Sequence, residues 1–235
     1  MHNLNRSNSY SKIDIDLFKA HWPDQDVKMT PSPETLDSLA KGVIHIHNLG
    51  FVINNCSFAS GVKWNSNFIE QLQEQLYSLS LYYINNPGII PIDLLNIKFI
   101  AIAAGKSSMK NKLCGAGTIM ECYAPNDKKY PCHLFFEAEK QSIRYTTIDF
   151  NDLNSITDSE CKECILLPIC PTCYGGNLIT SGKLNKKDDY TCIITKNRAK
   201  AGSWMVGQML IQQNKYKLFD NLNKEEIAMT VKVFL

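Results

Sequence analysis

The chain has 235 residues, of which 44% are hydrophobic and 20% are charged, and its formal net charge is +2 at pH 7. These values are typical of a globular protein that buries a sizeable core in one large domain or two small ones. The small net charge gives no support to nucleic-acid binding or membrane binding, and no run reaches the roughly 20 apolar residues that cross a bilayer.

The N-terminal part is predicted to begin with a short buried strand over residues 26–30. A helix follows, with Ser32 as its N-cap and Pro33 in its first turn. Gly50 stands where the left-handed C-cap of this helix belongs. The apolar positions of the helix recur every three or four residues: Leu36, Leu39, Val43 and Ile46.

Residues 51–54 are predicted to form the next strand, and a second helix opens near Asn65 or Ser66. The turn residues at 85–88 end that helix. Its predicted buried face consists of Ile69, Leu72, Leu76, Leu79 and Tyr83. This order of strands and helices is typical of βα units on a parallel sheet, and two such units are too few to close a barrel.

The remaining elements are less regular. Residues 97–104 are predicted to form a buried strand or a short helix, and residues 118–136 a hairpin that turns at 125–128. Residues 143–150 are assigned to a second antiparallel pair. A helix is expected over residues 199–214, with Trp204, Val206, Met209 and Leu210 as its apolar contacts. Residues 223–227 are expected to open a last helix.

Cysteine is the most informative residue type, because eight of the nine cysteines fall between Cys114 and Cys192. The densest run holds two CxxC units, Cys161–Cys164 and Cys170–Cys173, separated by five residues. The N-terminal residues lack the apolar core of an export signal, so a reducing, cytoplasmic compartment is expected. Clustered cysteines in that compartment favour a metal site over disulfides. The ninth, Cys56, is predicted to be a small buried apolar residue.

A CxxC pair directs two thiolates at one metal from a tight turn, and such pairs serve both zinc and iron–sulfur sites. The four cysteines of the dense run are enough for one zinc ion, which leaves Cys114, Cys122, Cys132 and Cys192 without a role. Two four-thiolate clusters use all eight. The glycines beside the ligands suit a backbone that passes close to a bulky cluster: Gly115, Gly117, Gly175 and Gly176.

Residues 108–235 resemble the SPASM domain, the auxiliary-cluster module of radical S-adenosylmethionine (SAM) peptide- and protein-modifying enzymes. The resemblance rests on eight cysteines in order, with Gly-Ala-Gly after the first, Tyr-Pro before the third and Tyr-Gly-Gly after Cys173. It implies two [4Fe-4S] clusters with interleaved ligands. The first cluster falls to Cys114, Cys122, Cys132 and Cys173, and the second to Cys161, Cys164, Cys170 and Cys192. The chain departs from the family in the spacing of the last CxxC pair, where three intervening residues are more usual.

Residues 1–107 resemble the last βα units of the radical SAM barrel in the same proteins, through Met29-Thr-Pro-Ser-Pro, His47-Asn-Leu-Gly-Phe51 and Gly61-Val-Lys-Trp64. The expected fold is therefore α/β plus α+β: an incomplete radical SAM βα barrel over residues 1–107, followed by a small cysteine-rich SPASM domain over residues 108–235.

A radical SAM enzyme needs a CxxxCxxC loop for its SAM-binding cluster, and this sequence contains none. The chain alone is therefore expected to produce no 5′-deoxyadenosine from SAM, and no catalytic residue is assigned. SAM becomes a cofactor only if the missing N-terminal part is supplied. We interpret the sequence as part of a longer enzyme, a truncated product, or one half of a split one.

The leading hypothesis is the cluster-binding C-terminal part of a radical SAM/SPASM maturase, which transfers electrons and positions a peptide or protein substrate. Its expected partners are that substrate and a chain carrying the radical SAM half, with neither nucleic acid nor membrane. One alternative is a non-catalytic cluster module that binds a peptide or partner. Another is a structural zinc protein.

Overall fold

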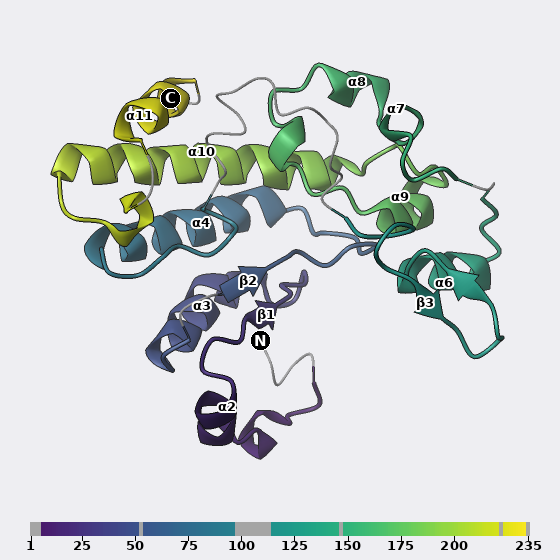
Figure 1. Ribbon diagram of the computed structural model, residues 1–235, viewed down its shortest axis with the longest axis horizontal. Coiled ribbons are helices and arrows are strands. Elements are labelled where there is room, and N and C mark those ends of the chain that lie inside the picture. The colour runs from purple at the N-terminus through teal and green to yellow at the C-terminus, as the bar shows by residue number, and fades with distance from the viewer. Residues whose placement is uncertain (1–5, 52–53, 97–113, 146–147, 221–222, 234–235) are drawn as a thin grey trace. The chain divides into compact units, whose positions relative to one another are not determined.

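Figure 1 shows the computed structural model, which describes residues 6–51, 54–96, 114–145, 148–220 and 223–233. The chain divides into two compact units. The first comprises Met1–Ala59, Lys63–Phe99 and Asn197–Leu235, and the second comprises Ser60–Val62 and Ile100–Lys196. The predicted boundary at residue 107 and the element expected over 97–104 both lie outside the described residues.

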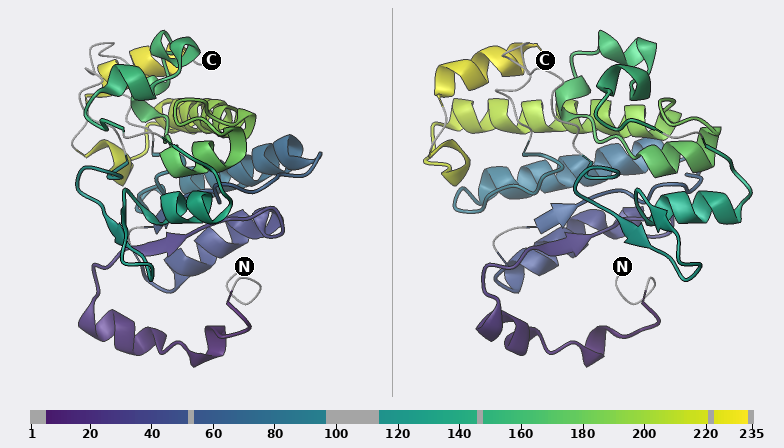
Figure 2. Two further views of the ribbon diagram at one scale, coloured as in Figure 1. Left: turned by 90° about the vertical axis from the view of Figure 1, so that its right-hand side faces the viewer. Right: turned by 45° about the vertical axis from the view of Figure 1, so that its right-hand side comes forward.

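The units differ from the predicted domains at the C-terminus, because Asn197–Leu235 folds with the N-terminal part. Helix α10 (Asp189–Gln212) begins ten residues before the predicted helix start, and its later turns pack on α4 (Phe68–Asn85). Tyr77 and Trp204 bring their rings within 5.1 Å across these two helices, which run side by side in both views of Figure 2. Local sequence patterns give no information about this long-range pairing.

The first unit contains the predicted βα units. Strand β1 (Val27–Met29) pairs in parallel with β2 (Asn54–Cys56), and α3 (Leu39–Asn48) connects them (Figure 1). The parallel pairing and the C-terminal turn at Gly50, whose φ is +88°, were both predicted. Short elements precede and join these: η1 (Tyr10–Lys12), α2 (Ile15–His21) and η2 (Leu36–Ser38).

The first predicted helix and the second predicted strand begin later in the structure than the sequence pattern indicated. The chain first turns helical at Leu36, because the hydroxyl of Thr35 accepts a hydrogen bond from the Ser32 amide at 2.9 Å and holds a turn there. Strand β2 begins at Asn54, where the predicted strand over 51–54 ends.

Helix α4 buries the predicted stripe, and Phe68, Leu72, Leu76, Leu79 and Tyr83 are each at most 1% exposed. Ile69 was wrongly predicted to belong to this face, since it is 45% exposed. It follows Phe68 directly, and successive helix residues point about 100° apart. The helix ends at Asn85, as the Asn-Asn-Pro-Gly turn indicated.

The C-terminal residues complete this unit. The hydroxyl of Tyr216 donates a hydrogen bond to the Ile84 carbonyl at 3.0 Å, and η4 (Lys217–Phe219) follows. Helix α11 (Lys224–Lys232) begins where predicted, because the Asn223 side chain accepts from the Glu225 amide. No helix of the described chain combines the length and apolar character needed to span a bilayer.

The second unit consists of short elements around a small core. The predicted hairpin is present as β3 (Cys122–Tyr123) and β4 (Lys129–Tyr130), paired antiparallel. Helix α6 (His133–Lys140) packs beside α9 (Tyr174–Ser181) (Figure 2). The connecting pieces are α7 (Leu153–Ile156), α8 (Ser159–Lys162) and η3 (Leu167–Ile169). The buried core comprises Ala116, Ala124, Tyr130, Cys132, Phe135, Ala138, Phe150, Ile156, Tyr174 and Leu178.

The second antiparallel pair expected over residues 143–150 is not formed by the described residues 143–145 and 148–150. Phe150 instead enters the core, where its ring lies edge-on to Phe135 and to Tyr174, each at 5.8 Å. Burial of this side chain therefore takes the place of strand pairing.

His47 on α3 is held in its neutral form by defined partners. The Ile92 amide donates to the Tyr83 hydroxyl at 3.2 Å, which leaves that hydroxyl to donate to His47 Nε2 at 3.0 Å. His47 Nδ1 then carries the proton and donates to the Phe51 carbonyl at 3.3 Å. Burial lowers the pKa of His47 below its ordinary value of 6.5, and the Phe51 hydrogen bond opposes part of that effect.

We therefore expect the free energy of unfolding to fall as the pH drops below 6.5, the ordinary His47 value. In the window between 6.5 and the lower folded pKa, the unfolded chain binds a proton that the folded chain does not, at a slope of at most about 1.4 kcal/mol per pH unit. Urea unfolding at a series of pH values measures this slope. His47→Gln should flatten it, and an unchanged slope in that variant would contradict the assignment.

Candidate metal centre

All eight predicted ligand cysteines belong to the second unit and are free thiols. Two of them occupy equivalent positions, since Cys132 is the N-cap of α6 and Cys173 is the N-cap of α9. Because these helices pack against each other, two cysteines far apart in the sequence lie at one end of a helix pair. The start of a helix presents free amides and the positive end of its dipole, and both favour a thiolate.

Cys114, Cys132 and Cys173 form the first neighbourhood. Cys132 is 7% exposed. Burial raises the pKa of its thiol, two main-chain amides of the following turn oppose that effect, and the charges of Cys173 and Cys114 raise the pKa further.

Main-chain amides also point at the other two sulfurs of this neighbourhood. The Ala116 amide donates to Cys114 Sγ at 3.5 Å, and the Gly176 amide donates to Cys173 Sγ at 3.4 Å. A Cβ at Gly176 would lie 3.1 Å from Cys173 Sγ, so the backbone passes close to the sulfur, as the glycines predicted. Such amide donors stabilise thiolates and cluster sulfurs alike.

Cys122, the fourth predicted ligand of the first cluster, lies on β3 directly across from Tyr130. It packs, partly buried, against the same core as Cys114. The hairpin therefore holds Cys122 and the chain leading to Cys132 on neighbouring strands.

Cys161, Cys164 and Cys170 form the second neighbourhood. The Cys164 amide donates to the Cys161 carbonyl at 3.1 Å, which closes the turn of the first CxxC unit. Burial raises the pKa of the Cys161 thiol, Lys187 lowers it, and the charges of Cys170 and Cys164 raise it.

Cys192, the last predicted ligand, lies on the first turns of α10 and is exposed. Thr195, one turn later on the same helix, brings Oγ1 within 3.5 Å of Cys170 Sγ. Residues three apart are neighbours on a helix surface, so Cys192 lies one turn before the residue that contacts Cys170.

Lys187 was not predicted from the sequence to lie near a cysteine. Its Nζ donates to Cys170 Sγ at 3.2 Å. The spacing of charged residues in the sequence cannot predict this contact, because only the tertiary packing of the second unit brings the loop close to Cys170.

The chemistry of these donors fits iron–sulfur clusters: thiols in two groups, with main-chain amides aimed at the sulfurs of the first. The side chains do not already form a coordination sphere. Among the described residues, no three His, Cys, Asp or Glu side chains are gathered as a group able to hold a metal ion. Cys56 takes no part in either group; it is 2% exposed, as predicted, and burial raises the pKa of its thiol.

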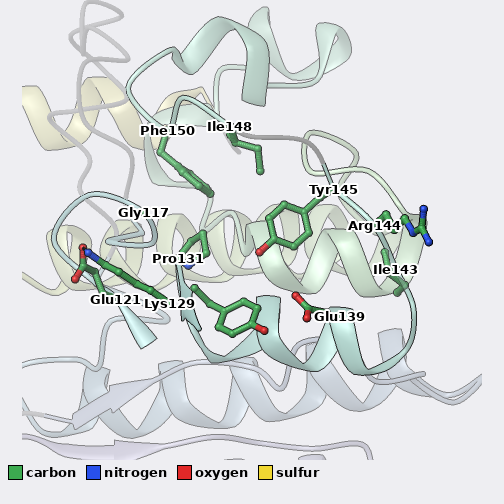
Figure 3. A pocket seen from close by; sticks show the side chains of 11 residues that line it. Gly117, Glu121, Lys129, Pro131, Glu139, Ile143, Arg144, Tyr145, Ile148 and Phe150 are labelled. Carbon is green, nitrogen blue, oxygen red and sulfur yellow. Dashed lines mark ion pairs between the residues drawn. The ribbon is translucent and has the colours of Figure 1, made fainter. Parts of the chain in front are cut away.

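An open cavity of about 780 Å³ lies beside the first neighbourhood (Figure 3). Its wall includes Pro131, which directly precedes Cys132 in the sequence, and Phe150 from the core. Glu139 and Tyr145 point toward each other across one end, and Glu121 pairs with Lys129 at the other. The remaining lining residues are Gly117, Tyr130, Ile143, Arg144 and Ile148. The cavity thus offers aromatic surface and charges of both signs.

Comparison with models of known protein families and with curated proteins found no match for this chain.

Proposed function

We propose that this chain is an iron–sulfur protein that binds two [4Fe-4S] clusters, as the C-terminal part of a radical SAM/SPASM peptide or protein maturase. The observation that supports the proposal is that Cys132 and Cys173 stand at the starts of the packed helices α6 and α9, whereas Cys170 faces Lys187 and Thr195 at the start of α10. The cysteine pattern implies that Cys170 and Cys173 belong to different ligand sets, which is not expected of one zinc ion held by the dense run.

In this proposal the first cluster is held by Cys114, Cys122, Cys132 and Cys173, and the second by Cys161, Cys164, Cys170 and Cys192. A cluster with four cysteine ligands accepts and donates single electrons and has no open site for a substrate. The amides at Ala116 and Gly176 would adjust its potential through hydrogen bonds to sulfur.

The cavity beside the first set is the proposed place for a peptide or protein substrate, because it combines aromatic walls with paired charges. The sequence contains no CxxxCxxC loop, so a chain carrying the radical SAM half is the proposed partner and the source of SAM chemistry. A cytoplasmic location follows from the need to keep the thiols reduced.

Anaerobic purification with iron, sulfide and zinc analysis tests the proposal. We expect brown protein with absorbance near ~400 nm and about eight irons per chain. Colourless protein with one or two zinc ions, and no iron uptake on reconstitution, would overturn the proposal in favour of a structural zinc site.

A further inference from the structure

The contact between Lys187 and Cys170 has a geometry that a solvated lysine does not explain. Lys187 is partly buried, and its Nζ lies 3.2 Å from Cys170 Sγ. Lys186, the preceding residue, is exposed. Holding a long cationic side chain in one place costs rotamer entropy, so a fixed contact to sulfur indicates a favourable interaction there.

The start of α10 fixes the backbone next to Lys187. Asp188 accepts a hydrogen bond from the Thr191 amide at 2.6 Å, in the manner of an N-cap. One turn further, Thr195 is 3% exposed and places Oγ1 3.5 Å from the same sulfur. Two side chains that flank one helix start therefore converge on Cys170 Sγ.

We propose that Lys187 tunes the second cluster, by donating a charged hydrogen bond to the ligand sulfur of Cys170 and thereby raising the reduction potential of that cluster. The inference rests on the proposed function. Reduction adds negative charge to a cluster, and a cation at a ligand sulfur stabilises the reduced form more than the oxidised form.

Thr195 is expected to assist in a smaller way. Its hydroxyl now donates to the Thr191 carbonyl at 2.8 Å. A metal-bound Cys170 sulfur has no proton to give, so the Thr195 hydroxyl would donate to it only by turning away from the Thr191 carbonyl. A neutral donor exerts less effect than the ammonium group at a similar distance.

The test is a redox titration of the loaded full-length chain, followed by electron paramagnetic resonance. Lys187→Met keeps the side-chain length and removes the charge. We expect it to lower the reduced-to-oxidised ratio of one cluster about tenfold at a fixed potential, which is ~59 mV for a one-electron couple, and to leave the other cluster unchanged. Lys187→Arg keeps the charge, so its reduced-to-oxidised ratio should stay within about threefold of the wild-type value. Thr195→Val should lower the ratio of the same cluster, by less than Lys187→Met does.

Lys186→Met is the matched control, since it removes the same charge from the neighbouring exposed position. Equal shifts in the two methionine variants, or no shift in Lys187→Met with about eight irons bound, would overturn the role of Lys187 alone. A wild-type chain that takes up no iron would overturn the proposed function itself. If Lys187→Met does not retain its iron, the Lys187→Arg variant becomes the test. A tenfold change in its reduced-to-oxidised ratio would contradict the inference.

Discussion

Replacing Cys173 by alanine is expected to halve the iron content of the reconstituted chain, from about eight to about four irons. The reason is that the cysteine pattern assigns Cys173 to the first set only, together with Cys132 at the start of the helix packed against its own. Iron and sulfide analysis measures the effect. Cys56→Ala is the matched control: that thiol is buried in the first unit, and its removal should leave the iron content unchanged.

Double variants separate interleaved ligands from sequential ones. Cys161→Ala with Cys170→Ala removes two ligands of the second set, and about four irons should remain. Cys170→Ala with Cys173→Ala removes neighbours in the sequence that belong to different sets, and nearly all iron should be lost. Equal iron in the two double variants would contradict the grouping of the sulfurs.

Replacing Gly117 by alanine is expected to lower the free energy of unfolding by about 3 kcal/mol, from overpacking and from a left-handed backbone together. The φ of Gly117 is +67°, and a Cβ there would overlap the ring of Phe150. That ring cannot move aside without disturbing its edge-on contacts with Phe135 and Tyr174. Denaturant unfolding of the metal-free chain measures the loss.

Gly182→Ala provides the control for this substitution. Gly182 has a similar φ of +70°, yet a Cβ there meets nothing within 4 Å. It should therefore show only the backbone effect, about 1 kcal/mol. If both variants lose the same stability, the clash with Phe150 contributes nothing and the account of this core is wrong.

Local patterns in the sequence predicted the elements of the first unit well, because their signals are local. Gly50 at a left-handed turn, the stripe on α4 and the Asn223 cap all follow from residues within one or two helical turns. The predicted helix boundaries were less accurate where a side chain, and not a main-chain carbonyl, accepts the hydrogen bond of an amide. The Thr35 hydroxyl does this ahead of α3.

Longer-range packing explains what the sequence did not reveal. Helix α10 begins ten residues earlier than predicted, so that Cys192 lies within this helix and not ahead of its start. The contact of Lys187 with Cys170 depends on a chain reversal that no local pattern encodes. The fold class and the cluster identity stay predictions.

The packing of α6 against α9 fixes the two helix starts that carry Cys132 and Cys173. A Cβ at Gly175 would lie 2.5 Å from Leu134 Cβ, so the two helices approach as closely as they do only because this residue is glycine. Apolar burial at Phe135 and Leu178 offsets part of the entropy of closing the long loop between the two cysteines. If the proposed first cluster forms, two of its ligands would therefore come from helices that already pack together.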